Sequence, residues 1–351
     1  MIFNGEKNHI INNFVLSKLQ YRQHFMKKNF LTYILIACLG FSAIAQENKN
    51  EGPKGKTIIQ VFGNFHSGFG AENDDRGFEL DRSYLGYQYS LDKGVQIKAV
   101  MDIGQSNDVD DYHRIAYIKN AQVSWATGRW RLDGGLIATT QFKVQEKFWG
   151  YRYIMKSFQD EYKFGSSADL GISASYNVNK WLSADAIIVN GEGYKKVQKN
   201  DGLLYGLGAT ITPLKGITIR LYGSLNEAAD KLADDSYNWA TFIGYKHERF
   251  SIGAEYNIYQ NYGNTKDADL YGISVYATTK LSNTVDLFAR YDNLSSKDDW
   301  NLSKDESATI IGAQFKAGKY VKIAPNFRMS IPSIDGADNK YSGYISCYFG
   351  F

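Results

Sequence analysis

The feature that most limits the fold of this chain is a two-residue alternation of apolar and polar side chains. In the stretch 95–103, Ile97 and Met101 would share one face of a strand, and Lys98 and Asp102 the other, because successive side chains of a strand point to opposite faces. The pattern predicts a sheet with one apolar and one polar side. A content of 26 Tyr, 20 Phe and 33 Gly, with 4 Pro, in 351 residues also favours strands over helices.

The same alternation recurs along the chain and predicts about sixteen strands, a count that we expect to hold to within two. The expected strands are 57–69, 78–91, 95–103, 115–126, 129–139, 164–178, 181–190, 202–212, 217–226, 236–246, 250–262, 268–280, 284–294, 307–316, 320–330 and 340–351. Short turns follow the even-numbered strands and longer polar loops follow the odd-numbered ones. An even strand number with this asymmetry is typical of bacterial outer-membrane barrels. The predicted fold class is therefore all-β, a transmembrane antiparallel β-barrel.

Two details refine this prediction. In the second expected strand, Phe78 and Leu80 favour one face, whereas Leu85 and Tyr87 favour the other, so we expect a β-bulge between them. Alternation alone does not say which face is inside, since a soluble barrel would point its apolar side chains inward and a porin outward. The apparent signal sequence, the loop asymmetry and the last strand favour the porin.

The N-terminus has the three parts of a secretory signal, namely a basic start, an apolar run and small residues before a cleavage site. A rival interpretation is a lipoprotein cleavage box ending at Cys38. The predicted parts are a mis-assigned start extension (1–25), a signal peptide (26–45), a periplasmic lead-in (46–56) and the barrel (57–351). Export to the outer membrane of a Gram-negative bacterium follows from this arrangement.

The last expected strand alternates and ends on Phe351. A terminal Phe on such a strand resembles the signal by which the barrel-assembly machinery recognises its clients, so we expect that machinery and outer-membrane lipid as partners. The rival interpretation is an edge strand of a soluble sheet, which closure of a barrel would remove.

Charge and rare residues exclude several function classes. The chain has 40 Lys and Arg against 37 Asp and Glu, and residues 1–45 hold five of the basic and one of the acidic residues, which leaves 35 against 36. This balance gives no support to nucleic-acid binding. His66, His113 and His247 are widely separated and have no metal-ligand spacing. We therefore expect no catalytic residues, no cofactor and no metal site, although the acidic runs at 108–111 and 298–299 leave open Ca²⁺ binding in outer loops.

Four sequence runs carry a resemblance to a known family. They are FELDRSYLGY at 78–87, EKFWGYR at 146–152, SADLG at 167–171 and NGEGY at 190–194. These runs resemble the porins related to the phosphate-selective O/P type of Bacteroidetes-like bacteria. The resemblance implies a sixteen-stranded barrel that forms a homotrimer, through which small hydrophilic solutes diffuse passively.

The longest interval without alternation, 140–163, is the third outer loop by the strand count, between the fifth and sixth strands. The resemblance implies that this loop folds into the lumen and sets the narrowest point of the pore. The residues that we expect at the constriction are Lys143, Glu146, Lys147, Trp149, Tyr151, Arg152 and Lys156 from the loop, with Arg129, Arg131, Arg220 and Arg290 from the wall. We expect Trp149 and Tyr151 to anchor the loop and Arg152 to face the permeating ion.

Selectivity is the least constrained property. Basic residues modestly outnumber acidic ones among the expected lumen residues, which predicts a weak preference for small anionic solutes over cations, with neutral solutes also passing. Phosphate selectivity would need a compact basic cluster, and the sequence does not single one out. The alternatives are a non-selective channel, a substrate-specific receptor or transporter, and a barrel enzyme. A receptor would need a plug domain, and residues 46–56 are too few to form one.

Overall fold

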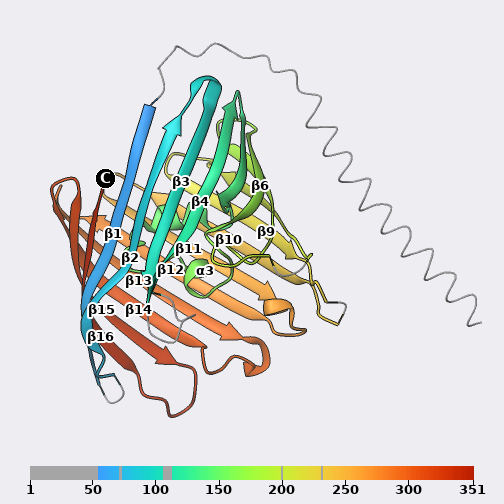
Figure 1. The fold of residues 1–351 in the computed structure, drawn as a ribbon. Helices are drawn as coiled ribbons and strands as arrows, with labels where there is room; N and C mark the ends of the chain where they lie inside the picture. The colour runs from blue at the N-terminus through green and yellow to red at the C-terminus, as the bar shows by residue number, and fades with distance from the viewer. Residues whose placement is uncertain (1–53, 71–72, 106–112, 199–200, 231) are drawn as a thin grey trace, which may run out of the picture. The chain divides into compact units, whose positions relative to one another are not determined.

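The computed structural model describes residues 54–351 except 71–72, 106–112, 199–200 and 231. The expected start extension, signal peptide and most of the lead-in lie outside the described residues, as does the acidic run at 108–111. The described chain forms one closed barrel in which each strand pairs in antiparallel fashion with its neighbours and β1 pairs with β16 (Figure 1). The prediction of a sixteen-stranded antiparallel barrel is confirmed.

The strand bounds follow the alternating segments within a few residues. The strands are β1 (Lys54–Phe69), β2 (Arg76–Ser90), β3 (Val95–Gln105), β4 (Arg114–Thr127), β5 (Trp130–Ala138), β6 (Ala168–Asn177), β7 (Leu182–Val189), β8 (Leu204–Ile211), β9 (Ile217–Asn226), β10 (Ser236–Lys246), β11 (Phe250–Gln260), β12 (Leu270–Lys280), β13 (Val285–Ser296), β14 (Glu306–Ala317), β15 (Val321–Pro332) and β16 (Lys340–Gly350). Helices α2 (Lys143–Trp149) and α3 (Phe158–Glu161) lie between β5 and β6, and three short 3-10 turns, η1 (Asp92–Gly94), η2 (Tyr262–Asn264) and η3 (Lys297–Asp299), lie in other connections. No helix in the described part of the chain is long and apolar enough to cross a membrane.

The connections at the two ends of the barrel differ in length, as the sequence predicts. The even-numbered strands end in tight turns, and β1 begins at the same end of the barrel (Figure 1). Between β4 and β5 the turn needs only Gly128 and Arg129, and Gly128 has a φ of 56°, a conformation that glycine adopts without steric cost. The odd-numbered strands end in the longer loops.

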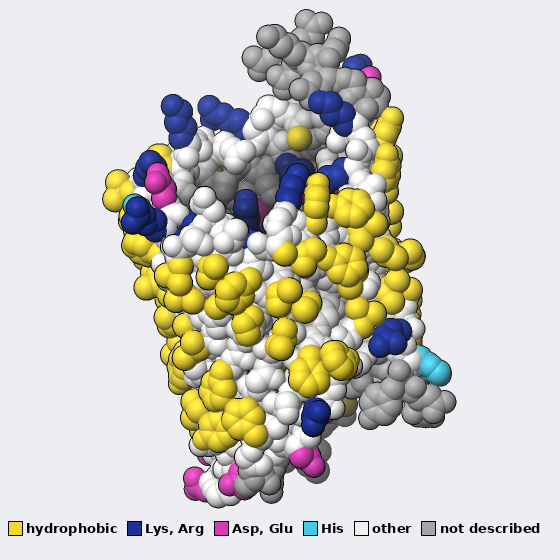
Figure 2. Space-filling model, turned by 90° about the vertical axis from the view of Figure 1, so that its left-hand side faces the viewer, with side chains coloured by type: hydrophobic (Ala, Val, Ile, Leu, Met, Phe, Trp, Pro, Cys, Tyr) yellow, Lys and Arg dark blue, Asp and Glu magenta, His cyan; other side chains and the backbone are white. Residues whose placement is uncertain are grey.

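The two faces of the wall differ in polarity, and their burial identifies the inner one. Along β10, Tyr237, Trp239 and Ile243 are exposed, whereas Asn238 and Phe242 are buried. Apolar side chains cover much of the outer surface (Figure 2). A barrel with apolar side chains outside and polar and charged ones inside is the arrangement expected of a barrel in lipid.

Two β-bulges adjust which side chains face inward. Opposite Gly63 of β1, strand β2 has one extra residue, since Phe62 pairs with Arg82 and Asn64 with Glu79. The bulge that the sequence predicts in the second strand is thereby confirmed. A second register shift separates Val100 from Met101 in the pairing of β3 with β4.

Candidate pore constriction

The segment 139–167, which connects β5 to β6, forms two short helices instead of strands. Helix α2 ends at Trp149, and Gly150 follows with a φ of 76° while its amide donates to the Glu146 carbonyl at 3.0 Å. A glycine in the left-handed conformation is the usual way to end a helix. The absence of alternation in this stretch therefore reflects two short helices, the glycine that ends the first of them and the irregular chain that leads back to β6.

Aromatic side chains hold the middle of the segment against the wall. Trp149 is 1% exposed, and its ring centroid lies 5.4 Å from that of Tyr276 on β12. Tyr151 packs on Phe288 of β13 at 4.8 Å. The indole of Trp149 also donates to the Met155 carbonyl at 2.9 Å, so the apolar ring is buried while its polar atom keeps a partner.

Three wall arginines donate to backbone carbonyls of the segment. Arg220 on β9 donates to Thr140 at 2.8 Å, Arg290 on β13 to Lys156 at 2.6 Å, and Arg328 on β15 to Ile154 at 2.8 Å. The several donors of a guanidinium allow each arginine to hold a carbonyl and a second partner at once. For Arg220 and Arg290 these second partners are carboxylates.

The carboxylate partners lie on the barrel wall. Arg220 pairs with Asp185 of β7, and Arg290 pairs with Asp292 at 2.6 Å, both side chains of the latter pair being 1% exposed. The charges of these two arginines are therefore compensated beside them. Buried ion pairs of this kind hold the two side chains in one position, because separating them would leave an uncompensated buried charge.

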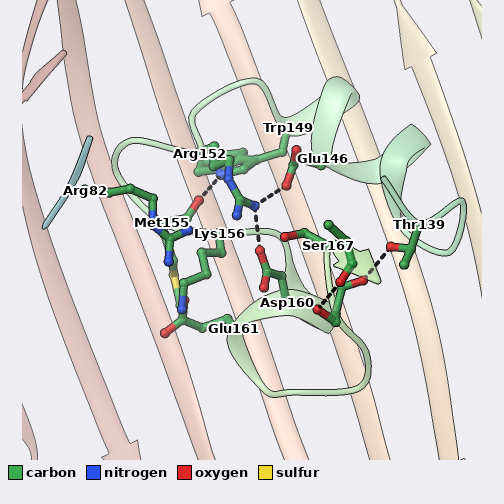
Figure 3. A network of polar contacts seen from close by, with 12 residues as sticks. Arg82, Thr139, Glu146, Trp149, Arg152, Met155, Lys156, Asp160, Glu161 and Ser167 are labelled. Atoms are coloured by element: carbon green, nitrogen blue, oxygen red, sulfur yellow. Dashed lines mark hydrogen bonds and ion pairs between the residues drawn. The ribbon is translucent and has the colours of Figure 1, made fainter. Parts of the chain in front are cut away.

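Arg152 lies at the centre of a second ion-pair network, within the segment itself. Its guanidinium pairs with Glu146 and, at 2.6 Å, with Asp160 (Figure 3), and it donates weakly to the Tyr84 hydroxyl of β2 at 3.5 Å. Burial by itself raises the pKa of the Asp160 carboxyl, but Arg152 and then Lys156 outweigh it and hold this pKa below its ordinary 3.8.

Further hydrogen bonds reach the segment from other sides of the barrel. Tyr153 donates to Gln314 of β14 at 2.9 Å, and Lys119 of β4 donates to Ser167 at 2.8 Å. Rings of β1 and β16 also contact it, since Phe62 and Tyr348 both pack near Tyr153. The segment thus contacts inward-facing side chains from nearly opposite parts of the wall.

A group of lysines lies on the other side of this arrangement. Lys98 of β3 interacts electrostatically with Lys119, Arg131 and Lys143. Arg131 pairs with Asp133 at 2.9 Å, whereas Lys98, Lys119 and Lys143 form no ion pair among the described residues. Asp133 also interacts with Lys98, so this group has four cations and one nearby carboxylate, and such an excess of positive charge attracts anions from solution.

The structure distributes the expected site residues over three environments. Trp149 and Tyr151 are buried against the wall, and Lys143 and Lys147 are exposed. Glu146, Arg152, Arg220 and Arg290 are in ion pairs, and Lys156 lies 3.6 Å from Glu161. Arg129 lies in the tight turn before β5, where it donates to the Val178 carbonyl at 2.9 Å, at the opposite end of β5 from the segment. The structure therefore does not bring Arg129 together with the others.

Sequence reasoning missed Lys119 and left the orientation of Arg82 open. The β3–β4 bulge leaves Lys119 out of the pairing, because Val100 pairs with Asn120 and Met101 with Ile118. Two adjacent polar residues, Lys119 and Asn120, were the available signal, since a bulge turns neighbours to the same side. Arg82 faces inward and contacts Asp102 at 3.2 Å.

No group of three or more His, Cys, Asp or Glu side chains suited to a metal ion occurs within the described ranges. The acidic pair Asp298 and Asp299 is exposed in the loop after β13. Calcium binding there remains the open alternative to a solvated acidic loop.

A family model described as putative beta-barrel porin-2, OmpL-like, matches residues 166–334, slightly less than half of the chain. No curated protein matches the sequence. The resemblance to the phosphate-selective O/P type stays a prediction.

Solved porins match the barrel over most of its length. Pseudomonas putida OprB, in a high-pH structure, has a TM-score of 0.67 at 12% identity, covering 85% of this chain and 94% of OprB. The chain has the fold of a porin. The anion-selective porin from Comamonas acidovorans has a TM-score of 0.63 at 12% identity, covering 85% of this chain and 100% of the Comamonas porin. The outer-membrane protein OmpT of Vibrio cholerae has a TM-score of 0.60 at 15% identity, covering 87% of this chain and 100% of OmpT.

Proposed function

We propose that this porin-fold protein is a passive outer-membrane channel for small hydrophilic solutes, with a weak preference for anions that includes phosphate. The observation that carries the proposal is the closed barrel with an exposed apolar outer face and a charged interior in which the segment 139–167 contacts several sides of the wall. Such a segment would leave a narrowed passage beside it, and a narrow passage gives fixed charges their influence over permeating ions.

The anion preference is supported by the uneven pairing of interior charges. Three carboxylates in or beside the segment, Glu146, Asp160 and Asp292, are each paired with an arginine, whereas Glu306 accepts a hydrogen bond from Tyr162 of the segment and forms no ion pair among the described residues. The ammonium groups of Lys98 and Lys143 form no ion pair within the described structure, although Asp133, which pairs with Arg131, also interacts with Lys98. The excess charge on the side of Lys98 and Lys143 is therefore positive, although water and salt in the lumen would screen it.

Conductance measurements in planar bilayers test this function directly. Reconstituted protein should give discrete conductance steps, and the reversal potential in a salt gradient should show anions to be more permeant than cations. Absence of conductance from folded protein would overturn the channel. A reversal potential of the cation-selective sign would overturn the anion preference alone, and competition by inorganic phosphate with chloride current would test that solute.

We further propose the location and the assembly. The N-terminal signal 26–45 would direct export, Phe351 would serve recognition by the barrel-assembly machinery, and the mature barrel would form a homotrimer. A band in SDS gels that persists without heating at three times the monomer mass would support the trimer. A single band at the monomer position whose mobility shifts on heating would support a folded barrel and contradict the trimer.

A further inference from the structure

The tight-turn end of the barrel carries a ring of exposed basic residues. Each of the seven turns has at least one Lys or Arg in it or at its edge. These residues are Lys93, Arg129, Lys180, Lys215, Lys246, Arg249, Lys280 and Lys319. The same turns hold two acidic residues, Asp92 and Glu248, and none of the eight cations forms an ion pair with a carboxylate in the described part of the chain.

An exposed apolar side chain lies within two residues of the cation at every turn. Examples with their exposed fractions are Trp181 at 50%, Leu281 at 63% and Tyr320 at 49%. The full set is Leu91, Trp130, Trp181, Leu214, Phe250, Leu281 and Tyr320. A repeated pair of one cation and one apolar group suits the interfacial region of a lipid leaflet, where the acyl chains adjoin the phosphate headgroups.

The opposite end of the barrel carries exposed charges of both signs, since Arg76, Lys196, Lys266 and Lys340 lie in or beside its loops. Exposed aspartates occur along its loops, namely Asp74, Asp75, Asp230, Asp267, Asp298, Asp299, Asp335 and Asp338. Figure 2 shows Lys and Arg gathered around the upper opening, Asp and Glu at the lower rim, and apolar side chains between them. The barrel therefore has a charge difference along its axis, with the basic end at the tight turns.

We propose that the ring of turns binds the anionic headgroups of phospholipids in the adjoining leaflet. In that leaflet each apolar neighbour would enter the acyl boundary while its Lys or Arg contacts a lipid phosphate. The distribution selects this partner, because the cations occupy all seven turns around the barrel. A lipid leaflet meets the turns on every lipid-facing side of the barrel, in a monomer or in a trimer, whereas a docked acidic protein would cover only one side. The inference rests on the proposed membrane location and does not depend on channel activity.

Quenching by brominated lipids measures this binding on the intact barrel. Trp130 and Trp181 are exposed at the tight-turn end, so bromine on neighbouring acyl chains should reduce their fluorescence. The barrel is reconstituted in mixed bilayers in which either phosphatidylglycerol or phosphatidylcholine is brominated. The ratio of the two quenching curves gives the relative lipid binding constant.

A matched pair of variants isolates the turn charges. The turn variant carries Lys180→Gln, Lys215→Gln, Lys280→Gln and Lys319→Gln. The loop variant removes four exposed cations from the other end, with Arg76→Gln, Lys196→Gln, Lys266→Gln and Lys340→Gln. A heat-modifiable gel shift confirms that each variant is folded.

We expect the wild-type barrel to favour phosphatidylglycerol about twofold or more at low salt, falling toward one at high salt as charges are screened. The turn variant should lower this ratio toward one and the loop variant should keep it. Equal quenching by both lipids in the wild type, or an unchanged ratio in the turn variant, would overturn the inference. Quenching by neither lipid would instead contradict the proposed membrane location on which the inference rests.

Discussion

Two sides of the barrel interior use positive charge differently. On the side of β9, β13 and β15, three arginines donate to carbonyls of the segment 139–167, and two of them are in buried ion pairs. On the side of β3 and β4, Lys98 and Lys119 form no ion pair among the described residues, and Lys143 of the segment adds a third such charge. We refer to these as the arginine side and the lysine side.

The difference follows from the chemistry of the two side chains. A guanidinium has five donors in a rigid plane and satisfies a carboxylate and a carbonyl together, so it can be buried as a structural support. An ammonium is compact and strongly hydrated, which keeps it accessible to water and ions. The charge of a lumen residue therefore does not by itself indicate a role in selectivity.

The largest change in stability should come from removing one of the arginines of the arginine side. Replacing Arg290 with Ala leaves Asp292 buried without its partner and removes the donor to the Lys156 carbonyl, at a cost of about 3–5 kcal/mol in stability. The unfolding temperature should fall and single-channel conductance should rise as the segment loosens.

The control is the double variant Arg290→Met with Asp292→Leu, which removes both charges. It should regain most of the lost stability, because Asp292 no longer remains as a buried carboxylate without its partner, yet conductance should stay raised because the carbonyl still lacks its donor. Equal unfolding temperatures for the single and double variants would contradict the role given to this ion pair.

A smaller effect should come from filling the contact between α3 and β12. A Cβ added at Gly272 would lie 2.1 Å from the ring of Phe158, which is fully buried, so Gly272→Ala should cost about 1–3 kcal/mol. Gly343→Ala is the matched control, since its Cβ would have no neighbour within 4 Å. Thermal unfolding that is equal for the two variants would show that α3 does not lie against β12.

A still smaller effect should come from the lysine side, and it should change selectivity without changing stability. The double variant Lys98→Gln and Lys143→Gln should lower the anion-to-cation permeability ratio on the order of twofold, since each lumen charge contributes less than about 1 kcal/mol in a screened lumen. Arg129→Gln, at the tight-turn end, should leave the reversal potential near the wild-type value. A larger change in Arg129→Gln than in the lysine variant would reverse this assignment.

The smallest effect concerns pH. Because the pKa of Asp160 lies below its ordinary 3.8, the stability from its contact with Arg152 is fully present above that value and is lost as pH falls through the lowered pKa. The unfolding temperature should therefore not depend on this pair between pH 8 and pH 5. In Arg152→Gln the main cause that lowers this pKa is lost while burial still raises it, so the loss of stability on acidification that Asp160 causes should shrink or reverse; identical pH profiles for the variant and the wild type would exclude the coupling.

Local pattern was enough to predict the wall of this barrel. The alternation located sixteen strands, the glycine- and asparagine-containing turns marked their ends, and the mismatch between Phe78 and Leu85 located a bulge that β2 contains. These features depend on residues close in sequence, because side-chain direction in a strand reverses at every residue. The position of the segment 139–167 between the fifth and sixth strands follows from the same count.

The partners of the interior charges required the tertiary structure. Arg290 and Lys156 are 134 residues apart in the chain, and Tyr153 and Gln314 are 161 apart, distances over which no periodicity carries information. The inward turn of Lys119 depends on a register shift between β3 and β4. The sequence by itself determined the number, order and ends of the strands, since these follow from local steric and hydropathic rules. Only the tertiary structure decided which arginines support the segment and which lysines stay accessible, because closing the barrel brings together residues that the sequence keeps apart.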